Sequence, residues 1–273
     1  MTGLADSPLG RAAKYPEGHD PGLLFSIERG PQRALLGLGG ALPFGGVDLW
    51  TAYEVSWLDV AGKPQVAIAA FTVPADSPRL VESKSVKLYL AGLNLTRFAA
   101  AADVAETLAR DLGNAVGAAI RVTLMPPHEN AAPPLADLAG ICIDAQPIAV
   151  DRYEPLPEAL AVAGPARSET LVSRLFRSVC PVTGQPDYAC VQIGYRGPGI
   201  DHAGLLRYLV SFRRHPGFHE HCVERIFADV WRRCRPEALS VYARFTRRGG
   251  IDINPYRSSG GGTPPVHVRT ARQ

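Results

Sequence analysis

The hydrophobic pattern changes its period several times along the chain, and these changes define the expected elements. Residues 46–60 and 65–73 are rich in β-branched and aromatic side chains, with a polar "AGKP" segment between them. Such runs around a short turn are typical of paired β-strands. Residues 83–94 and 97–116 then switch to the apolar spacing of amphipathic helices, and 119–125 returns to strand character.

The second half of the chain repeats this order. Its expected elements are a strand pair, two helices and a closing hairpin, over residues 170–179, 188–196, 202–214, 217–234 and 238–257. Sliding the first half onto the second aligns Lys87-Leu88-Tyr89-Leu90 with Leu206-Arg207-Tyr208-Leu209. We therefore interpret the chain as two tandem β-β-α-α-β-β units of an α+β fold, each an antiparallel sheet with helices on one face.

The segments outside these patterns set the expected domain boundaries. Residues 1–45 are rich in Gly and Pro, lack periodicity, and are expected to form an extended N-terminal arm. The first unit is expected to cover residues 46–150 and the second residues 167–273, with 151–166 as the linker. One further strand is expected within 138–145.

Composition limits the class of protein. The 273 residues are 46% hydrophobic and 20% charged, which supplies enough apolar surface for one large core or two ordinary ones. The net charge of +3 is too small to demand a nucleic-acid partner, although it suits an anionic cofactor. No apolar run resembles a signal peptide or reaches the length of a membrane span, so a cytoplasmic protein is expected.

The five cysteines are odd in number and form no C-x-x-C pair, so reduced thiols are expected. Cys180 differs from the others because it begins the turn "CPVTGQPD", which ends at Asp187. A turn fixes the direction of a nucleophilic sulfur, and a nearby carboxyl group can transfer its proton. Cys180 and Asp187 are therefore candidate catalytic residues. The alternative is a packing cysteine, which we expect for Cys142, Cys190 and Cys234.

The segment "HPGFHEHCVE" concentrates histidine and acidic side chains at the expected start of a helix. His219 and Cys222 are three residues apart and could share a face as zinc ligands, but His221 cannot join them. A second interpretation is that His219 and Glu220 hold a polar ligand. A third is a solvated helix N-terminus, where acidic residues complement the helix dipole.

Two further segments carry polar groups next to backbone that can bind a ligand. "VESKS" places Glu82 at a helix start, where it can cap the helix or accept N–H donors from a heterocycle, while free helix N–H groups can bind an anion. "RFTRRGG" places Arg244, Arg247 and Arg248 near a Gly-Gly turn. Their guanidinium groups suit phosphate binding, and the alternative is a solvated hairpin. "GLGGALPFGG" lacks the dinucleotide-binding spacing and is interpreted as a loop.

Together these motifs resemble the 7-cyano-7-deazaguanine reductases of the queuosine pathway in their long, two-unit form. The resemblance is carried by "ESKSVKLYL", "CPVTGQPD", "HPGFHEHCVE" and "RRGGIDINPYR", with "LPFGGVDLW" and "FTVPADSPRLVESKS", and it covers nearly the whole chain. It implies a tunnelling fold, shared with GTP cyclohydrolase I, and a homodimer. It also implies reduction of a nitrile to a primary amine at the expense of two NADPH, with no metal ion.

The resemblance further implies a role for each candidate residue. Cys180 would form a covalent thioimide with the nitrile carbon of 7-cyano-7-deazaguanine, and Asp187 would donate the proton. Contacts to the substrate would come from Val81, Glu82, Ser83, His219 and Glu220. Contacts to NADPH would come from Ser83, Lys84, Arg248 and Gly249. Neither nucleic acid nor membrane would be a direct partner.

Two other functions are alternatives to this one. A metal-dependent enzyme of the same fold that opens a pterin or purine ring would need a His and Cys zinc set, and no convincing third ligand is present in the sequence. A noncatalytic module that binds a purine or RNA fits the Arg-rich second half loosely. Such a module leaves the placement of Cys180 and Asp187 unexplained.

Overall fold

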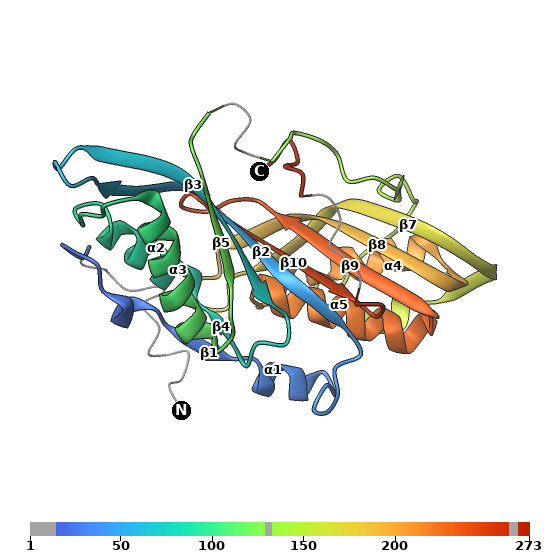
Figure 1. Cartoon of the computed structure of the whole chain (residues 1–273). Helices are drawn as coiled ribbons and strands as arrows, with labels where there is room; N and C mark the ends of the chain where they lie inside the picture. The colour runs from blue at the N-terminus through green and yellow to red at the C-terminus, as the bar shows by residue number, and fades with distance from the viewer. Residues whose placement is uncertain (1–14, 129–132, 262–266) are drawn as a thin grey trace. The chain divides into compact units, whose positions relative to one another are not determined.

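The chain has an α+β fold in a computed structural model that describes residues 15–128, 133–261 and 267–273 (Figure 1). Its strands are β1 (Ser26–Glu28), β2 (Gly45–Leu58), β3 (Pro64–Pro74), β4 (Arg79–Val81), β5 (Arg121–Met125), β6 (Ile141–Cys142), β7 (Val162–Val179), β8 (Pro186–Ile200), β9 (Ala238–Phe245) and β10 (Ile251–Ser258). Its helices are α1 (Gly30–Leu35), α2 (Ser83–Gly92), α3 (Ala101–Val116), α4 (His202–Val210) and α5 (His219–Cys234), with 3-10 turns η2 (Pro21–Leu23), η3 (Pro157–Ala159) and η4 (Ser211–Arg214). None of these helices combines the length and the hydropathy that crossing a membrane requires.

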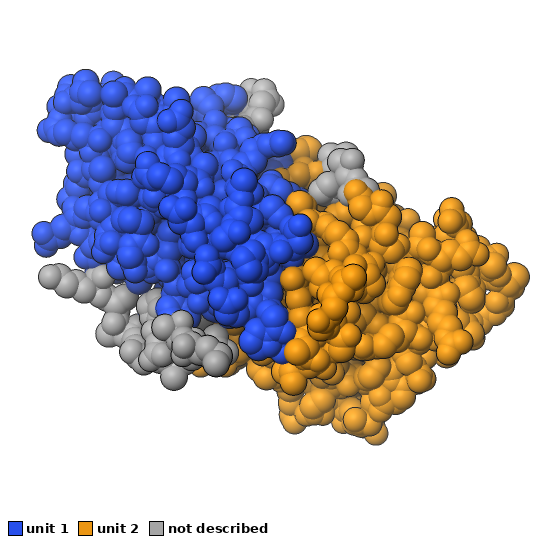
Figure 2. Space-filling model, turned by 60° about the horizontal axis from the view of Figure 1, so that its bottom comes forward, with its two compact units in different colours: residues 1–31, 48–133, 247–253 blue, residues 32–47, 134–246, 254–273 orange. Residues whose placement is uncertain are grey.

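The described residues cluster into two compact units, which Figure 2 colours separately. Unit 1 lies within residues 1–31, 48–133 and 247–253, and unit 2 lies within residues 32–47, 134–246 and 254–273. The boundaries cross β2 and β10, so each of these two strands contributes residues to both units.

In unit 1, β3 lies between β2 and β5, and it pairs with β5 in the antiparallel direction. The buried face of α3 repeats every four residues at Val104, Leu108 and Leu112, which is the spacing of an amphipathic helix packed on a core. Trp50 and Phe71 complete this core and stack with 5.5 Å between ring centroids. Strands β1 and β4 form a separate two-stranded antiparallel sheet.

In unit 2, the strands follow the order β10-β9-β8-β7-β6, antiparallel except for the parallel pair β6 and β7. Ala189, Val191 and Ile193 alternate along β8, so they project from one face of the sheet into the core. Leu205 of α4 and Ile226 of α5 belong to the same core, which places both helices against this face. The expected strand pair and the two expected helices of the second half are therefore confirmed, while the strand expected within 138–145 is only two residues long.

The N-terminal segment differs from the expected extended arm. Residues 1–14 lie outside the described residues, but the part that follows contains η2, β1 and α1. The hydrophobic pattern gives no sign of α1, because this short helix is held by a distant partner. Arg33 of α1 donates two hydrogen bonds to the carboxylate of Glu224 in α5, at 2.9 and 2.7 Å.

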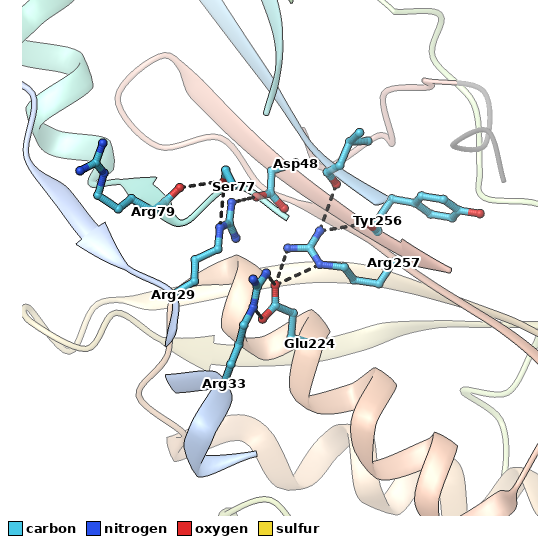
Figure 3. Close-up of polar contacts among 9 residues, drawn as sticks. Arg29, Arg33, Asp48, Ser77, Arg79, Glu224, Tyr256 and Arg257 are labelled. Atoms are coloured by element: carbon cyan, nitrogen blue, oxygen red, sulfur yellow. Dashed lines mark hydrogen bonds and ion pairs between the residues drawn. The ribbon is translucent and has the colours of Figure 1, made fainter. Parts of the chain in front are cut away.

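Glu224 is the centre of a buried charge cluster that fixes α5 within unit 2 (Figure 3). Besides Arg33 it accepts hydrogen bonds from Nη2 and Nε of Arg257 on β10, at 2.8 and 3.1 Å. Glu224 and Arg257 are completely buried, and buried ion pairs require this kind of complete hydrogen bonding. The figure also shows, within unit 1, the buried pair of Arg29 with Asp48.

The helix pair of each unit contains the same buried hydrogen bond. Tyr89 of α2 donates to Oδ2 of Asp111 in α3 at 2.8 Å, and Tyr208 of α4 donates to Oδ2 of Asp229 in α5 at 2.7 Å. Burial and the adjacent carboxylate raise the pKa of both tyrosines, so each hydroxyl keeps its proton. These two tyrosines are the ones that the internal alignment of the sequence superimposes.

Candidate active site

Cys180 lies directly after β7, where the β7–β8 hairpin turns. Its N–H donates to the carbonyl of Gln185 at 2.8 Å, and its carbonyl accepts from the N–H of Gly184 at 3.0 Å. Gly184 has a φ of 69°, a left-handed conformation that glycine adopts without strain. The turn is therefore tight and doubly hydrogen-bonded, and it fixes the direction of a cysteine that is only 5% exposed.

Asp187 lies on β8 next to this turn. It is the antiparallel partner of Ser178, so the two side chains project from the same face of the hairpin. Asp187 is buried, and its Oδ1 lies 3.6 Å from Nε2 of His219. The structure thus brings the predicted proton donor together with a predicted substrate-binding histidine.

The start of α5 is attached to the hairpin by backbone hydrogen bonds. The N–H of Val179 donates to the carbonyl of His215 at 3.0 Å, and the N–H of Gly217 donates to the carbonyl of Val179 at 3.1 Å. This contact places the first turn of α5, with His219 and the buried Glu220, beside the end of β7 that carries the nucleophile candidate.

Phe245 and Cys222 complete the surroundings of His219 and Asp187. Phe245, the last residue of β9, stacks on His219 with 3.8 Å between ring centroids. Burial raises the pKa of Cys222 to about 12, and the charges of Asp187 and Glu220 act in the same direction. A thiol with this pKa stays protonated near neutral pH, which disfavours Cys222 as a nucleophile.

In unit 1, the predicted residues around Glu82 form the start of α2. Oε1 of Glu82 accepts from the N–H of Lys84 at 2.6 Å and Oε2 accepts from the N–H of Ser85 at 2.9 Å, so the carboxylate caps the helix. A carboxylate has about four lone-pair sites, so this cap is compatible with a further donor from a ligand. Val81 ends β4 and Ser83 begins α2, on either side of the almost fully buried Glu82.

The Gly-Gly turn of unit 1 lies against α2. Gly249 and Gly250 have φ values of 60° and 79°, and the N–H of Arg248 donates to the carbonyl of Ile251 at 2.9 Å. A Cβ on Gly249 would lie 3.1 Å from Cδ of Lys87, so the Lys87 side chain passes directly over the turn. Cationic side chains next to a glycine turn suit the phosphates of an anionic cofactor.

The predicted site residues therefore form two groups, one in each unit. Unit 2 holds Cys180, Asp187, His219 and Glu220, and unit 1 holds Val81, Glu82, Ser83, Lys84, Arg248 and Gly249. Phe245 was not predicted, since nothing in the sequence distinguishes it from an ordinary strand residue. In the described part of the chain, no three His, Cys, Asp or Glu side chains gather as a metal-binding group.

The remaining cysteines differ in one respect from the expectation. Cys190 and Cys234 are buried, as expected, but Cys142 is exposed. It lies on the two-residue strand β6, with Nη1 of Arg174 at 3.1 Å from its sulfur. An edge strand this short buries little side-chain surface, which explains why Cys142 does not pack.

Comparison with known proteins assigns the family. Residues 15–124 match the family described as "Nitrile reductase, 7-cyano-7-deazaguanine-reductase N-term", and residues 186–262 match that of the "QueF-like protein". An NADPH-dependent 7-cyano-7-deazaguanine reductase of Bordetella pertussis is 56% identical over 271 residues, which cover 99% of both chains. The chain belongs to the NADPH-dependent 7-cyano-7-deazaguanine reductase family.

Other 7-cyano-7-deazaguanine reductases are similar over the same length. The protein of Chromobacterium violaceum is 55% identical over 98% of this chain and 96% of its own, and that of Burkholderia vietnamiensis is 52% identical over 98% of each. Among solved structures, an archaeosine synthase QueF-Like in the apo form covers 37% of this chain and 99% of its own, with 20% identity and a TM-score of 0.31.

Proposed function

We propose that this protein reduces the nitrile group of 7-cyano-7-deazaguanine to an aminomethyl group with two NADPH, as a step of queuosine biosynthesis. Membership of the reductase family supports the substrate and the cofactor. The observation that carries the chemistry is the β7–β8 hairpin. It presents a thiol at the turn and a buried carboxyl group on the adjacent strand, with His219 against that carboxyl group.

Cys180 is the proposed nucleophile. Its thiolate adds to the nitrile carbon, one carbon–nitrogen π bond becomes an N–H bond, and the product is a thioimide that accepts a hydride more readily than a nitrile does. Two NADPH molecules, bound in turn, would each supply one hydride, with loss of the Cys180 thiolate between the two transfers and with the second proton taken from solvent. The sulfur thus returns to its starting state after each turnover.

Asp187 is the proposed proton donor to the nitrile nitrogen. It follows the turn on the strand adjacent to Cys180, which supports a position near the reacting bond. His219 borders the same carboxyl group and is proposed to contact the substrate and orient Asp187. General acid catalysis requires a donor within about 3 Å of the accepting atom, and apo geometries commonly tighten when substrate binds.

Substrate recognition is assigned to buried acidic groups and their neighbours. Glu82 and Glu220 are 1% and 2% exposed, and carboxylates accept N–H donors of the kind that a purine-like ring presents. Val81 and Ser83, which flank Glu82, are proposed to contact the same ring. Burial makes such contacts selective, since a ligand that lacks the donors forgoes hydrogen bonds to carboxylates that water does not solvate.

NADPH binding is assigned to the Gly-Gly turn and the start of α2. Arg248 and Lys84 would hold phosphate groups, Gly249 would allow close approach of the backbone, and Ser83 would contribute its hydroxyl. The passage of Lys87 over the turn supports this assignment, because it brings a further cation to the same surface.

For the chain as a whole we propose two tandem tunnelling-fold repeats, covering residues 46–150 and 167–273. The N-terminal arm over 1–45 then includes η2, β1 and α1, and the linker over 151–166 ends in the first residues of β7. The order β7-β8-α4-α5-β9-β10 supports the second repeat. We also propose a homodimer that acts in the cytoplasm, without direct contact to nucleic acid or membrane. Sedimentation equilibrium of the full chain measures the oligomeric state, and a monomer at all concentrations contradicts the proposed dimer.

The deciding experiment is intact-mass analysis after incubation with the nitrile alone. Wild-type protein is expected to gain the mass of one nitrile, and Cys180→Ala is expected to fold and to gain none. Cys190→Ala is the matched control, because this cysteine lies within β8, and it should still form the adduct. An adduct on Cys180→Ala, or no NADPH oxidation when the nitrile is added to wild type, contradicts the proposal.

A further inference from the structure

The stacking of Phe245 on His219 has a geometry that needs support from its surroundings. The two rings are nearly parallel, with 1° between their planes and 3.8 Å between their centroids. Aromatic rings prefer offset or edge-to-face arrangements over a direct face-to-face stack. A direct stack therefore persists when the backbone and side chains around it hold both rings in place.

Phe245 is held by a connected pair of buried amide side chains. Its N–H donates to Oδ1 of Asn254 at 3.1 Å, and its carbonyl accepts from Nε2 of Gln273 at 2.7 Å. The same Nε2 donates to Oδ1 of Asn254 at 3.0 Å. Phe245 and Asn254 are fully buried and Gln273 is 8% exposed, so these hydrogen bonds form away from solvent.

The carboxamide of Gln273 has a single possible orientation. Its Oε1 accepts from Nε of Arg244 at 2.9 Å and from the N–H of Thr270 at 3.0 Å, while its Nε2 makes the two donor contacts described above. All four hydrogen-bonding positions of the amide are thus occupied. If the amide oxygen and nitrogen exchanged places, the NH2 group would face two donors and the oxygen would face two acceptors. The amide therefore keeps one orientation, and in it the Nε2 donor holds the carbonyl of Phe245.

We infer that Gln273 is a positioning residue for nitrile reduction, and that it acts through Phe245 on the ring plane of His219. This inference rests on the proposed roles of His219 and Asp187. Gln273 binds the backbone of Phe245, the Phe245 ring stacks on His219, and Nε2 of His219 lies 3.6 Å from Oδ1 of Asp187. A shift of Phe245 changes the tilt of His219, and with it the distance between His219 and the proton donor.

The test is a double-mutant cycle on thioimide formation. Gln273→Glu keeps the side-chain length and the acceptor for Arg244, but it replaces the donor to Phe245 with a second acceptor. We would measure the single-turnover rate of adduct formation with the nitrile, normalised to the fraction of molecules that form the adduct. The proteins compared are wild type, Gln273→Glu, His219→Ala and the double variant. We expect Gln273→Glu to slow the reaction about five- to tenfold in wild type and to cause no further slowing in His219→Ala.

The controls separate positioning from general destabilisation. Arg272→Ala alters the neighbouring residue, which is exposed and donates to the carbonyls of Arg174 and Ala189, and it should leave the rate unchanged. If Gln273→Glu does not fold, Phe245→Leu replaces it in the cycle, because this variant retains apolar volume without a ring. It should slow adduct formation in wild type and cause no further slowing in His219→Ala.

Two results overturn the inference, namely a wild-type rate in Gln273→Glu or an additive loss in the double variant, since additive effects indicate independent action. If Phe245→Leu is the variant used, the inference is overturned by a wild-type rate of adduct formation in that variant. It is also overturned if the slowing by Phe245→Leu adds to the slowing by His219→Ala. If wild-type protein forms no adduct at all, the proposed function fails, and the positioning role fails with it.

Discussion

Nε2 of His219 and Oδ1 of Asp187 are 3.6 Å apart, with 13% and 4% of their side chains exposed. This separation is slightly longer than a hydrogen bond, although it lies within the range of an ion pair. A small rotation of the imidazole would close it, and catalytic contacts commonly tighten when substrate binds. The pair is therefore placed so that His219 can orient the carboxyl group of Asp187, the proposed proton donor.

The first prediction concerns the proposed role of Asp187 as proton donor. Asp187→Asn keeps the shape of the side chain and removes the transferable proton, so thioimide formation should slow by about 10²- to 10⁴-fold. Nitrile binding, measured by calorimetry in a Cys180→Ala background, should change much less. Adduct formation at the wild-type rate would restrict Asp187 to a structural role in the hairpin.

The second prediction concerns cofactor binding. A charge-assisted hydrogen bond contributes roughly 1.5–3 kcal/mol, so Arg248→Ala should raise the Michaelis constant for NADPH by about ten- to a hundredfold. Adduct formation needs no cofactor and should be unaffected in this variant. Arg121→Ala, which removes an exposed arginine of β5, serves as the control. Equal Michaelis constants for Arg248→Ala and wild type would exclude Arg248 from the cofactor site.

The third prediction concerns the buried charge cluster of Glu224. Glu224→Gln keeps the shape but removes the carboxylate charge that pairs with the buried guanidinium groups of Arg33 and Arg257. Breaking a buried pair in this way costs about 3–5 kcal/mol, whereas an exposed pair contributes at most about 1 kcal/mol. Glu158→Gln is the matched control, because Glu158 and Arg152 are each 57% exposed. Urea denaturation should separate the two variants, and equal free energies of unfolding would refute the assignment.

The fourth prediction is a pH dependence of stability. Burial, and secondarily the charge of Arg225, lower the pKa of His215 to about 4 from 6.5. Between these values the unfolded chain binds more protons than the folded one, so the free energy of unfolding decreases as pH falls through this interval. Because His215 is partly exposed, its contribution between pH 7 and 5 is on the order of 1 kcal/mol.

His215→Asn removes the ionisable group, so urea denaturation at pH 7 and pH 5 should show a smaller loss of stability than in wild type. The same pH dependence in both proteins would mean that His215 is not desolvated in the folded state.

The sequence predicts the elements whose signal is local. Residues 170–179 and 188–196 have the alternation of a half-buried strand pair, and the structure confirms the hairpin while extending it to Val162 and Ile200. The extension was missed because the first residues of β7 are exposed, so they carry no hydrophobic alternation. Helix α5 was predicted within one or two residues, since its apolar spacing continues over four turns.

Features that depend on distant contacts were not predicted. Helix α1 is short and depends on the ion pair of Arg33 with Glu224, which are far apart in the chain. Phe245 supports His219 only because β9 ends beneath the first turn of α5, and local sequence does not specify this packing. The turn at Cys180 was predictable for the opposite reason, since Pro, Thr and Gly within six residues encode it locally.

The hydrogen bond of Tyr89 with Asp111 and that of Tyr208 with Asp229 allow one contact to be compared in two environments of the same protein. One chemical contact is present twice in the same molecule, with similar lengths and against two different cores. Tyr→Phe at either position deletes the same atom, so any difference between the two losses of stability comes from the surroundings. Comparing the two variants under identical solution conditions shows how far the surroundings determine the contribution of one buried hydroxyl to the free energy of unfolding.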